Sequence, residues 1–395
     1  MKTILFFLLF AYPVFCSAQQ LPYQFSDSIM RHVFNDTSKE TDFEQKAAEL
    51  SFIIDYKDDL EEWDSTNLSQ KGQILTKDDS AWFHKFKPIN AHDYIIERTK
   101  KERIIMINEA HHQPQHRVFV ESLLGDLYKE VYRFLGCETM PYHKDSELNA
   151  QKYPVQGTGY YSKQPQFGNM IRAAIDDGYY VFGYEASFKS GEYTPEKREI
   201  EQAQHVKAFL DANPDAKFII YCGYGHLAKS SKKIETMEMR LKEYTGIEPF
   251  CIDQTTFTEK GSPEYEDAFY KLIHPGYDAV LIDSSGKAMG SPYLPNVYDV
   301  CVYHPNTTYK HGRPDWVFAN GRTPIFLRGN ITLPFPCMVS AYYEGEDYSK
   351  AVPVDIIELK NEDDENHKAL ALGKGNYYII IRDTQNETQV FRTEL

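Results

Sequence analysis

The residues of this sequence that are best suited to chemistry are carboxylates and imidazoles that follow short apolar runs. Four successive runs end in Glu or His, and these residues are Glu109, His111, His112, Glu138, Glu185 and His226. A carboxylate flanked by imidazoles can take a proton from water, and a further imidazole can stabilise the negative charge that develops. The pattern predicts a hydrolytic site with Glu109 as the first choice of general base.

The same residue types are metal ligands. His111 and His226 can bind a divalent cation such as Mn²⁺ or Zn²⁺, and Glu138 can complete the metal shell. Alternatively, Glu138 and Glu185 can orient the histidines. His111 and His112 are adjacent and their side chains diverge, so at most one is expected at the centre. No G-x-S-x-G turn or H-E-x-x-H motif is present, so neither a serine hydrolase nor a zincin is indicated.

A wider set of residues is expected to bind ligand around this centre: His116, Arg117, Tyr160, Tyr161, Tyr224, His304 and Arg313. His116 lies just after Pro114 in the first turn of an expected helix, where the positive helix end favours the neutral, ligand-competent imidazole. Arg117 has the alternative of pairing with Glu121 on the same helix.

A second cluster spans residues 304–316 and contains His304, Arg313 and Trp316. It follows the last expected strand of the α/β region, so it can reach the same crevice and supply a cationic clamp and an aromatic wall. The alternative is a structured linker in which Arg313 pairs with Asp315.

The elements that must position these residues alternate between strands and helices. The expected strands are 103–108, 132–137, 179–184, 217–222, 247–252, 278–282 and 297–303, and the expected helices are 116–130, 169–177, 195–212 and 229–244. Near-continuous apolar strands that alternate with helices predict an α/β fold with a mainly parallel sheet and helices on both faces. Ligands of such sheets bind outside the carboxyl ends of the strands, where the acidic residues and histidines are expected.

Two further segments have a different character. Residues 141–166 lack periodicity and are expected to form a mobile loop that overhangs the crevice, with Tyr160 and Tyr161 facing the ligand. Beyond about residue 323, four strand patterns follow one another with no helix expected between them: 325–327, 338–343, 354–359 and 377–382. They predict a small C-terminal antiparallel β-sandwich.

The expected organisation has four parts. Residues 1–18 resemble a secretory signal peptide, because Lys2 precedes an apolar run and small residues stand three and one before Gln19. Residues 19–86 form a helical N-terminal extension with an amphipathic helix at 41–54 and no evident chemistry. The α/β domain covers 87–322 and the β-sandwich 323–395. The mature protein is therefore expected to be secreted or periplasmic, without a transmembrane segment.

Composition narrows the choice of partners. The net charge is -15, with 58 acidic against 43 basic residues, which argues against a nucleic-acid partner. The 29 tyrosines suit ring-bearing ligands and β-rich cores equally.

Without Cys16, five widely spaced cysteines remain, and most lie in strand-like runs. We expect buried free thiols rather than a disulfide framework.

The motifs of the first and fourth runs resemble those of a known superfamily. Glu109-x-His111-x4-His116 resembles the opening motif of the ChaN-like haem-binding proteins, and Gly223-Tyr224-Gly225-His226 is similar to the G-x-x-H motif of the Tiki and TraB/GumN proteins. Erythromycin esterase (EreA), in the same superfamily, has a similar Glu-x-x-His, here Glu109 and His112.

This resemblance covers roughly residues 100–255, and Glu138 and Glu185 fall where erythromycin esterase has further glutamates. In the Tiki and TraB/GumN proteins a second G-x-x-H motif opens the domain, and Asn108-Glu109-Ala110-His111 resembles it. Asn108 stands where that motif has glycine, so the turn there can differ. The resemblance implies an EreA/ChaN-like domain and a small-molecule or peptide substrate with an ester, lactone or peptide bond.

Three functions remain open at this point. The first is an exported hydrolase with the Glu/His site described above. The second is an exported haem- or iron-binding protein, with His111, His116 or a tyrosine as axial ligand. The third is an adhesion or scaffold protein in which the C-terminal sandwich is the functional part.

Overall fold

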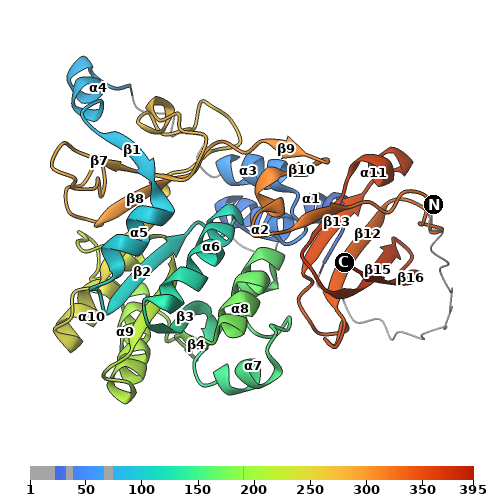
Figure 1. Cartoon of the computed structure of the whole chain (residues 1–395), viewed down its shortest axis with the longest axis horizontal. Coiled ribbons are helices and arrows are strands. Elements are labelled where there is room, and N and C mark those ends of the chain that lie inside the picture. Colours follow the sequence, from blue (N-terminus) through green and yellow to red (C-terminus); the bar gives the residue numbers. More distant parts are fainter. Residues whose placement is uncertain (1–22, 33–38, 66–73, 190) are drawn as a thin grey trace.

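The computed structural model describes residues 23–32, 39–65, 74–189 and 191–395, so the expected signal peptide lies outside the described residues. Its centre is a mainly parallel sheet, as the sequence predicted (Figure 1). Within the described chain the strand order is β1-β7-β8-β6-β2-β5-β3-β4. The strands are β1 (Lys87–Asn90), β2 (Ile104–Glu109), β3 (Tyr132–Pro141), β4 (Tyr180–Glu185), β5 (Lys217–Gly223), β6 (Phe250–Phe257), β7 (Ala279–Ile282) and β8 (Val300–Tyr303). β7 runs antiparallel to β8, and β1 runs antiparallel to β7.

Helices cover both faces of the sheet. α5 (Ala91–Thr99), α6 (Gln115–Lys129) and α8 (Pro165–Asp177) pack on one face, and α9 (Pro195–Ala212) and α10 (Met237–Thr245) pack on the other. Residues 104–107 of strand β2 are all apolar because both faces of the strand are buried. Ile105 and Ile107 lie in the core with α6 and α8, whereas Ile104 and Met106 lie in the core with α9 and α10.

Helix boundaries depart from the sequence expectation where capping decides them. α8 begins at Pro165, four residues earlier than expected, because the Gln164 side chain accepts the N–H of Phe167 and Pro165 suits the first turn. α10 begins at Met237, eight residues later than expected, because Thr236 caps it by accepting the N–H of Met239.

The expected loop 141–166 is more ordered than its sequence indicated. It contains α7 (Asp145–Gln151) and a 3₁₀ turn, η1 (Tyr161–Lys163). The side chain of Asn149 donates to Val181 O at 2.7 Å and accepts the N–H of Val181 at 3.0 Å. The first half of the segment is therefore attached to edge strand β4, and only its second half, around Tyr161, reaches the site.

The first three N-terminal helices lie between the sheet and the C-terminal strands, whereas the fourth packs at the β1–β7 end of the sheet (Figure 1). They are α1 (Ser26–Arg31), α2 (Lys39–Phe52), α3 (Tyr56–Ser65) and α4 (Lys77–Phe83), and α2 falls close to the helix expected at 41–54. Ile29 and Phe52 share one apolar cluster with Val118 of α6 and Ile356 of the C-terminal region.

The C-terminal region is built on antiparallel strands, as expected. Its main sheet has the order β13-β12-β15-β16, and β11 pairs with β14 in a second small sheet. The elements are β11 (Thr323–Ile325), β12 (Cys337–Tyr343), β13 (Asp355–Leu359), α11 (Glu362–His367), β14 (Leu370–Leu372), β15 (Asn376–Asp383) and β16 (Thr388–Glu394). The expectation of no helix here was wrong, because Asn361 caps α11 by accepting the N–H of Asp364.

Two general expectations can be compared with the described chain. Its five cysteines are free and buried, which confirms the expectation of buried thiols: Cys137, Cys222, Cys251, Cys301 and Cys337. Within the described ranges, no helix is both long and apolar enough to cross a membrane.

Candidate functional site

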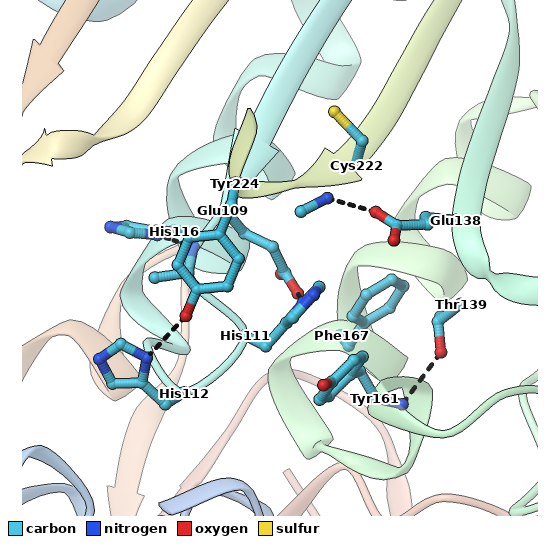
Figure 2. Close-up of polar contacts among 12 residues, drawn as sticks. Glu109, His111, His112, His116, Glu138, Thr139, Tyr161, Phe167, Cys222 and Tyr224 are labelled. Atoms are coloured by element: carbon cyan, nitrogen blue, oxygen red, sulfur yellow. Dashed lines mark hydrogen bonds and ion pairs between the residues drawn. The ribbon is translucent and has the colours of Figure 1, made fainter. Parts of the chain in front are cut away.

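The strand order brings the expected residues to one edge of the sheet. β5 lies between β2 and β3, and β4 follows β3, so the carboxyl ends of these four strands are neighbours. Glu109 is the last residue of β2, Glu185 is the last residue of β4, and Glu138 lies in β3. Figure 2 shows His111 beside Glu109, with Glu138 across from it.

Glu109 is a buried carboxylate, and both of its oxygens accept hydrogen bonds. Arg117 Nε donates to its Oε2 at 2.6 Å and Arg117 Nη2 to its Oε1 at 2.8 Å, while the Tyr221 hydroxyl donates to Oε2 at 2.5 Å. Burial alone raises the pKa of Glu109, but Arg117 and His111 outweigh it and lower this pKa to about 2. A carboxylate held in this way is a weak base, so the role of general base predicted for Glu109 does not fit its surroundings.

His111 is the group that Glu109 orients. Its Nδ1 lies 2.8 Å from Glu109 Oε1, and its ring stacks on Tyr161 with centroids 3.9 Å apart. A Cβ atom added to Gly223 would lie 2.5 Å from His111 Nε2, so this nitrogen lies directly against the Gly223 backbone. Because Nδ1 donates to the carboxylate, Nε2 is the nitrogen left to accept a proton.

A second group of charges lies on the other side of Gly223. The N–H of Gly223 donates to Glu138 Oε2, and Arg198 Nη2 donates to Glu138 Oε1. His226 lies between two carboxylates, with Nε2 3.2 Å from Glu138 Oε1 and Nδ1 2.7 Å from Glu199 Oε1. Burial lowers the pKa of His226, but Glu138 and Glu199 outweigh it and raise this pKa to about 10. His226 is therefore an imidazolium at neutral pH.

Glu185 is tied to the same arginine. Arg198 Nε donates to its Oε1 at 3.0 Å and Arg198 Nη2 to its Oε2 at 2.7 Å, and Gln202 also donates to Oε1. Arg198 lies in the first turn of α9, which Thr194 caps by accepting the N–H of Lys197. This arginine therefore joins the ends of β3 and β4, and its neighbouring carboxylates raise its pKa.

Asn108 does more than replace the glycine of the paired motif. Its Nδ2 donates to Tyr224 O at 2.8 Å and to Asp253 Oδ1 at 2.6 Å, and its Oδ1 accepts the N–H of Gln254. The amide thus joins β2 to β6 and to the Gly223–His226 turn. It supports Tyr224, whose φ of 32° is unusual for a residue with a side chain.

Two cavities adjoin His111. The first is lined by Glu109, His111, Glu138, Thr139, Tyr161, Phe167 and the end of β5, and leaves about 10 Å³, close to the room that one water molecule needs. The second holds about 120 Å³ and is lined by His111, His112, Tyr161 and Tyr224 together with α2 and α3. Tyr161 separates them, and its N–H donates to Thr139 Oγ1 at 3.0 Å (Figure 2).

His112 lines only the larger of the two cavities, and His116 lines neither. The ring of His112 stacks on Trp63 at 4.0 Å, and its Nδ1 lies 3.3 Å from the Tyr224 hydroxyl. His116 is fully buried, its Nδ1 accepts the N–H of Ala110, and its Nε2 lies 3.3 Å from Thr258 Oγ1. Burial holds the pKa of both rings well below the ordinary value, so both are neutral. With both nitrogens engaged, His116 is a structural residue.

The remaining expected ligand residues lie elsewhere. Tyr160 donates to Gln45 and packs on Phe52 of α2. His304 is buried, with Nδ1 2.7 Å from Asp278 and Nε2 3.1 Å from Gln254. The prediction that segment 304–316 supplies a clamp for this crevice is therefore wrong for His304.

The two ion pairs considered as alternatives are not formed. Arg313 forms a buried bidentate pair with Asp355 of β13 at 3.0 and 3.1 Å, rather than with Asp315. Arg117 pairs with Glu109 across the start of α6, and the Glu121 carboxylate instead binds Arg322. In both cases the partner lies on another element: Asp355 of β13 for Arg313, and Glu109 of β2 for Arg117.

The residues do not fit a metal centre. Both nitrogens of His226 face carboxylates, and the Arg198 guanidinium lies 3.1 Å from its Nε2, where a metal ion would be repelled. No group of three or more metal-ligating side chains occurs among the described residues. The metal site predicted for His111, His226 and Glu138 is thus not supported by the donor arrangement. His116 is not suited to bind haem iron as an axial ligand either, because both of its ring nitrogens already have partners.

Several site residues were missed because they lie on elements with no motif of their own. Arg198 and Glu199 belong to a highly charged helix whose exposed and buried residues look alike in sequence. Tyr221 is one aromatic residue within an apolar strand. Trp63 comes from α3, in the extension where no chemistry was expected. Only the packing of α3 against the segment after β6 brings it to His112, since Tyr56 donates to Glu259 and Asp64 accepts the N–H of Ser262.

Comparisons with known proteins give distant matches. No family model and no curated protein matches the sequence. Among solved structures, the type III effector HopBA1 is 13% identical with a TM-score of 0.33, covering 46% of this chain and 94% of that one. The Campylobacter jejuni ChaN structure with cofacially bound heme is 12% identical with a TM-score of 0.31, covering 47% and 92%. RRSP, a MARTX toxin effector domain from Vibrio vulnificus, is 14% identical with a TM-score of 0.32, covering 42% and 36%. Similarities at this level carry no conclusion about the activity of this chain.

Proposed function

We propose that this protein is an exported hydrolase that cleaves an ester, lactone or peptide bond with His111 as the general base. The observation that carries the proposal is the Glu109–His111 pair beside a cavity of about 10 Å³, close to the room that one water molecule needs. Export rests on the signal-peptide pattern of residues 1–18.

In the proposed mechanism Glu109 orients and stabilises the base, His111. Glu109 is fixed by Arg117 and Tyr221, so it holds His111 Nδ1–H and leaves Nε2 without a proton, beside Gly223 and at the edge of the small cavity. His111 Nε2 takes the proton as the water oxygen attacks the carbonyl carbon. The resulting imidazolium is stabilised by the Glu109 charge behind it, and it then gives its proton to the leaving oxygen or nitrogen as the C–O or C–N bond of the tetrahedral intermediate breaks.

One neutral group suits the oxyanion that forms. Burial raises the pKa of Tyr161 to about 12, so its hydroxyl remains protonated and can donate a hydrogen bond. The cations Arg198 and His226 are bound by Glu138, Glu185 and Glu199, so they fix the positions of these carboxylates rather than supply free positive charge.

The test compares two histidines with similar packing. His111 stacks on Tyr161 at 3.9 Å, and His205 stacks on Tyr142 at 3.8 Å, away from the cavities. A panel of aryl esters, lactones and short peptides is assayed with the wild type, His111→Gln and His205→Gln. We expect His111→Gln to lower kcat by about 10²- to 10⁴-fold, and His205→Gln to leave it nearly unchanged.

Two outcomes would count against the proposal. Equal activity of His111→Gln and the wild type would remove His111 as the base. An inactive panel, together with a haem absorbance band that disappears in His111→Ala, would favour the binding protein instead.

A further inference from the structure

The larger of the two cavities beside His111 has room for part of a substrate. The smaller one, at about 10 Å³, is close to the size of one water molecule and suits the attacking water of the proposed reaction. The larger one holds about 120 Å³ and also has His111 in its wall. Because the carbonyl to be cleaved must lie within reach of His111, the group attached to its carbon is expected in the larger cavity.

The volume of this cavity limits that group to about one ring. An apolar cavity of about 150 Å³ is large enough to bind benzene. The cavity beside His111 holds about 120 Å³, so it suits a single six-membered ring and has no room for a second one. A fused or macrocyclic acyl group would not fit without rearrangement of the wall.

Five of the eight lining residues carry rings, and these rings form two walls. Trp63 lies nearly parallel to His112 and to Tyr224, with interplanar angles of 11° and 9°. Tyr161 lies nearly parallel to His111, at 11°. His111 in turn is at 89° to Tyr224 (Figure 2). The cavity therefore has two aromatic walls that are nearly perpendicular to each other.

Two perpendicular aromatic walls favour a flat aromatic ring over a saturated group. Aromatic rings prefer to stack with an offset or to meet edge to face. A ring that lies parallel to the Trp63 wall is nearly perpendicular to Tyr161, so it can make both kinds of contact at once. A cyclohexyl or alkyl group of the same size fills the space but gains no such attraction.

The charges around the cavity disfavour an ionic group of either sign. Burial and then the positive charge of Lys260 lower the pKa of His112, and the same positive charge would repel a cation beside that ring. Burial and then the negative charge of Glu138 raise the pKa of Tyr161, and that charge would repel an anion. Glu44 also lines the cavity, but it is exposed, and water weakens its attraction for a cation.

We propose that this cavity binds one uncharged aromatic ring, and that the substrate of the hydrolase carries this ring on the carbonyl that is attacked. The inference rests on the proposed function for the place of the ring, and on the two aromatic walls for its chemistry. It narrows the substrate class to esters or amides of single-ring aromatic acids such as benzoic acid. Trp63 is then a residue that determines specificity, because it belongs to one wall of the cavity.

The first measurement is binding by the full chain, which needs no catalysis. Acetophenone, cyclohexyl methyl ketone and tetramethylammonium are titrated by calorimetry. We expect acetophenone to bind at least about tenfold more tightly than the other two, and Trp63→Leu to weaken its binding by about tenfold. Trp82→Leu is the matched control, because Trp82 also lies on an N-terminal helix but is 38% exposed and packs on Phe86 and Phe269.

The second measurement concerns turnover. The ratio of kcat/KM for methyl benzoate to kcat/KM for methyl cyclohexanecarboxylate is determined by titration of the released acid. We expect this ratio to be about tenfold lower in Trp63→Leu than in the wild type, and unchanged in Trp82→Leu. If Trp63→Leu does not fold by circular dichroism, Ala48→Leu takes its place, because it fills the cavity from α2 and is expected to cause the same loss.

Failure of this inference can be told apart from failure of the proposed function. If acetophenone does not bind, or if the variants leave its binding unchanged, the ring site is overturned even where His111 cleaves other esters. Tighter binding of tetramethylammonium or of the cyclohexyl ketone also overturns it. If acetophenone binds and Trp63→Leu weakens it, but no ester, lactone or peptide is cleaved, the hydrolase is overturned and the ring site stands.

Discussion

At the scale of single residues, the neighbours of each histidine in the site determine whether it is held as a cation. Glu109 and Glu138 are both buried carboxylates held by an arginine, and both have a pKa below the ordinary value. His111 has one nitrogen bound by a carboxylate, whereas His226 has a carboxylate at each nitrogen. The first keeps one nitrogen free of any carboxylate, and the second is held as a cation.

This difference predicts a stability effect at high pH. The pKa of His226 rises from 6.5 to about 10 on folding, so the stabilisation from its ion pairs is present in full below pH 6.5 and is lost as the pH rises through 10. We expect the free energy of unfolding in urea to fall between these pH values more steeply for the wild type than for His226→Asn. Equal slopes for both proteins would contradict the assignment of His226 as an imidazolium.

At the scale of elements, the turn after β5 determines how closely the two halves of the site approach. Gly223 lies between His111 and Glu138, and a Cβ atom there would be 2.5 Å from the His111 ring and 3.3 Å from Glu138 Oε2. Its N–H also donates to Glu138. The glycine of the G-x-x-H pattern is therefore required here by close approach and not by an unusual φ.

Two glycines of the same turn provide a matched comparison. Gly223→Ala forces His111 away from its position, and we expect the free energy of unfolding to fall by about 1–3 kcal/mol. Gly225→Ala meets no atom within 4 Å, and we expect a change of less than about 0.5 kcal/mol. Urea unfolding of both variants gives the measurement. Similar values for the two would mean that the Gly223 contact does not constrain the turn.

At the scale of the whole molecule, buried ion pairs attach the C-terminal strands to the α/β sheet. Arg172 of α8 forms a bidentate pair with Glu346 at 2.7 Å and also donates to Val352 O. Arg313 and Asp355 form a second such pair. The apolar cluster around Phe52, Val118 and Ile356 lies between the same regions. These contacts hold the regions together as one packed unit.

This attachment predicts a large difference between two arginines. Arg172→Met leaves Glu346 as a buried charge without its partner, and we expect a loss of about 3–5 kcal/mol in the free energy of unfolding. Arg392→Met removes an exposed pair with Glu344 within the C-terminal sheet, and we expect about 0–1 kcal/mol. Thermal and urea unfolding check both values. A small effect of Arg172→Met would mean that the Arg172 pair contributes little to the attachment.

The sequence by itself determined the fold class and the edge of the sheet where the charged residues gather. Apolar runs buried on both faces specify parallel strands, and a polar residue at the end of such a run has to lie at the carboxyl edge. Glu109, Glu138 and Glu185 could be placed in this way from local pattern alone.

Only the tertiary structure decided what those residues do. The base strength of Glu109 depends on Arg117 and Tyr221, and the charge of His226 depends on Glu138 and Glu199. A pKa is set by burial and by charges within a few ångströms, and those neighbours come from strands and helices far apart in the chain. For the same reason the local pair expected between Arg117 and Glu121 gave way to partners that the sequence pattern does not bring together.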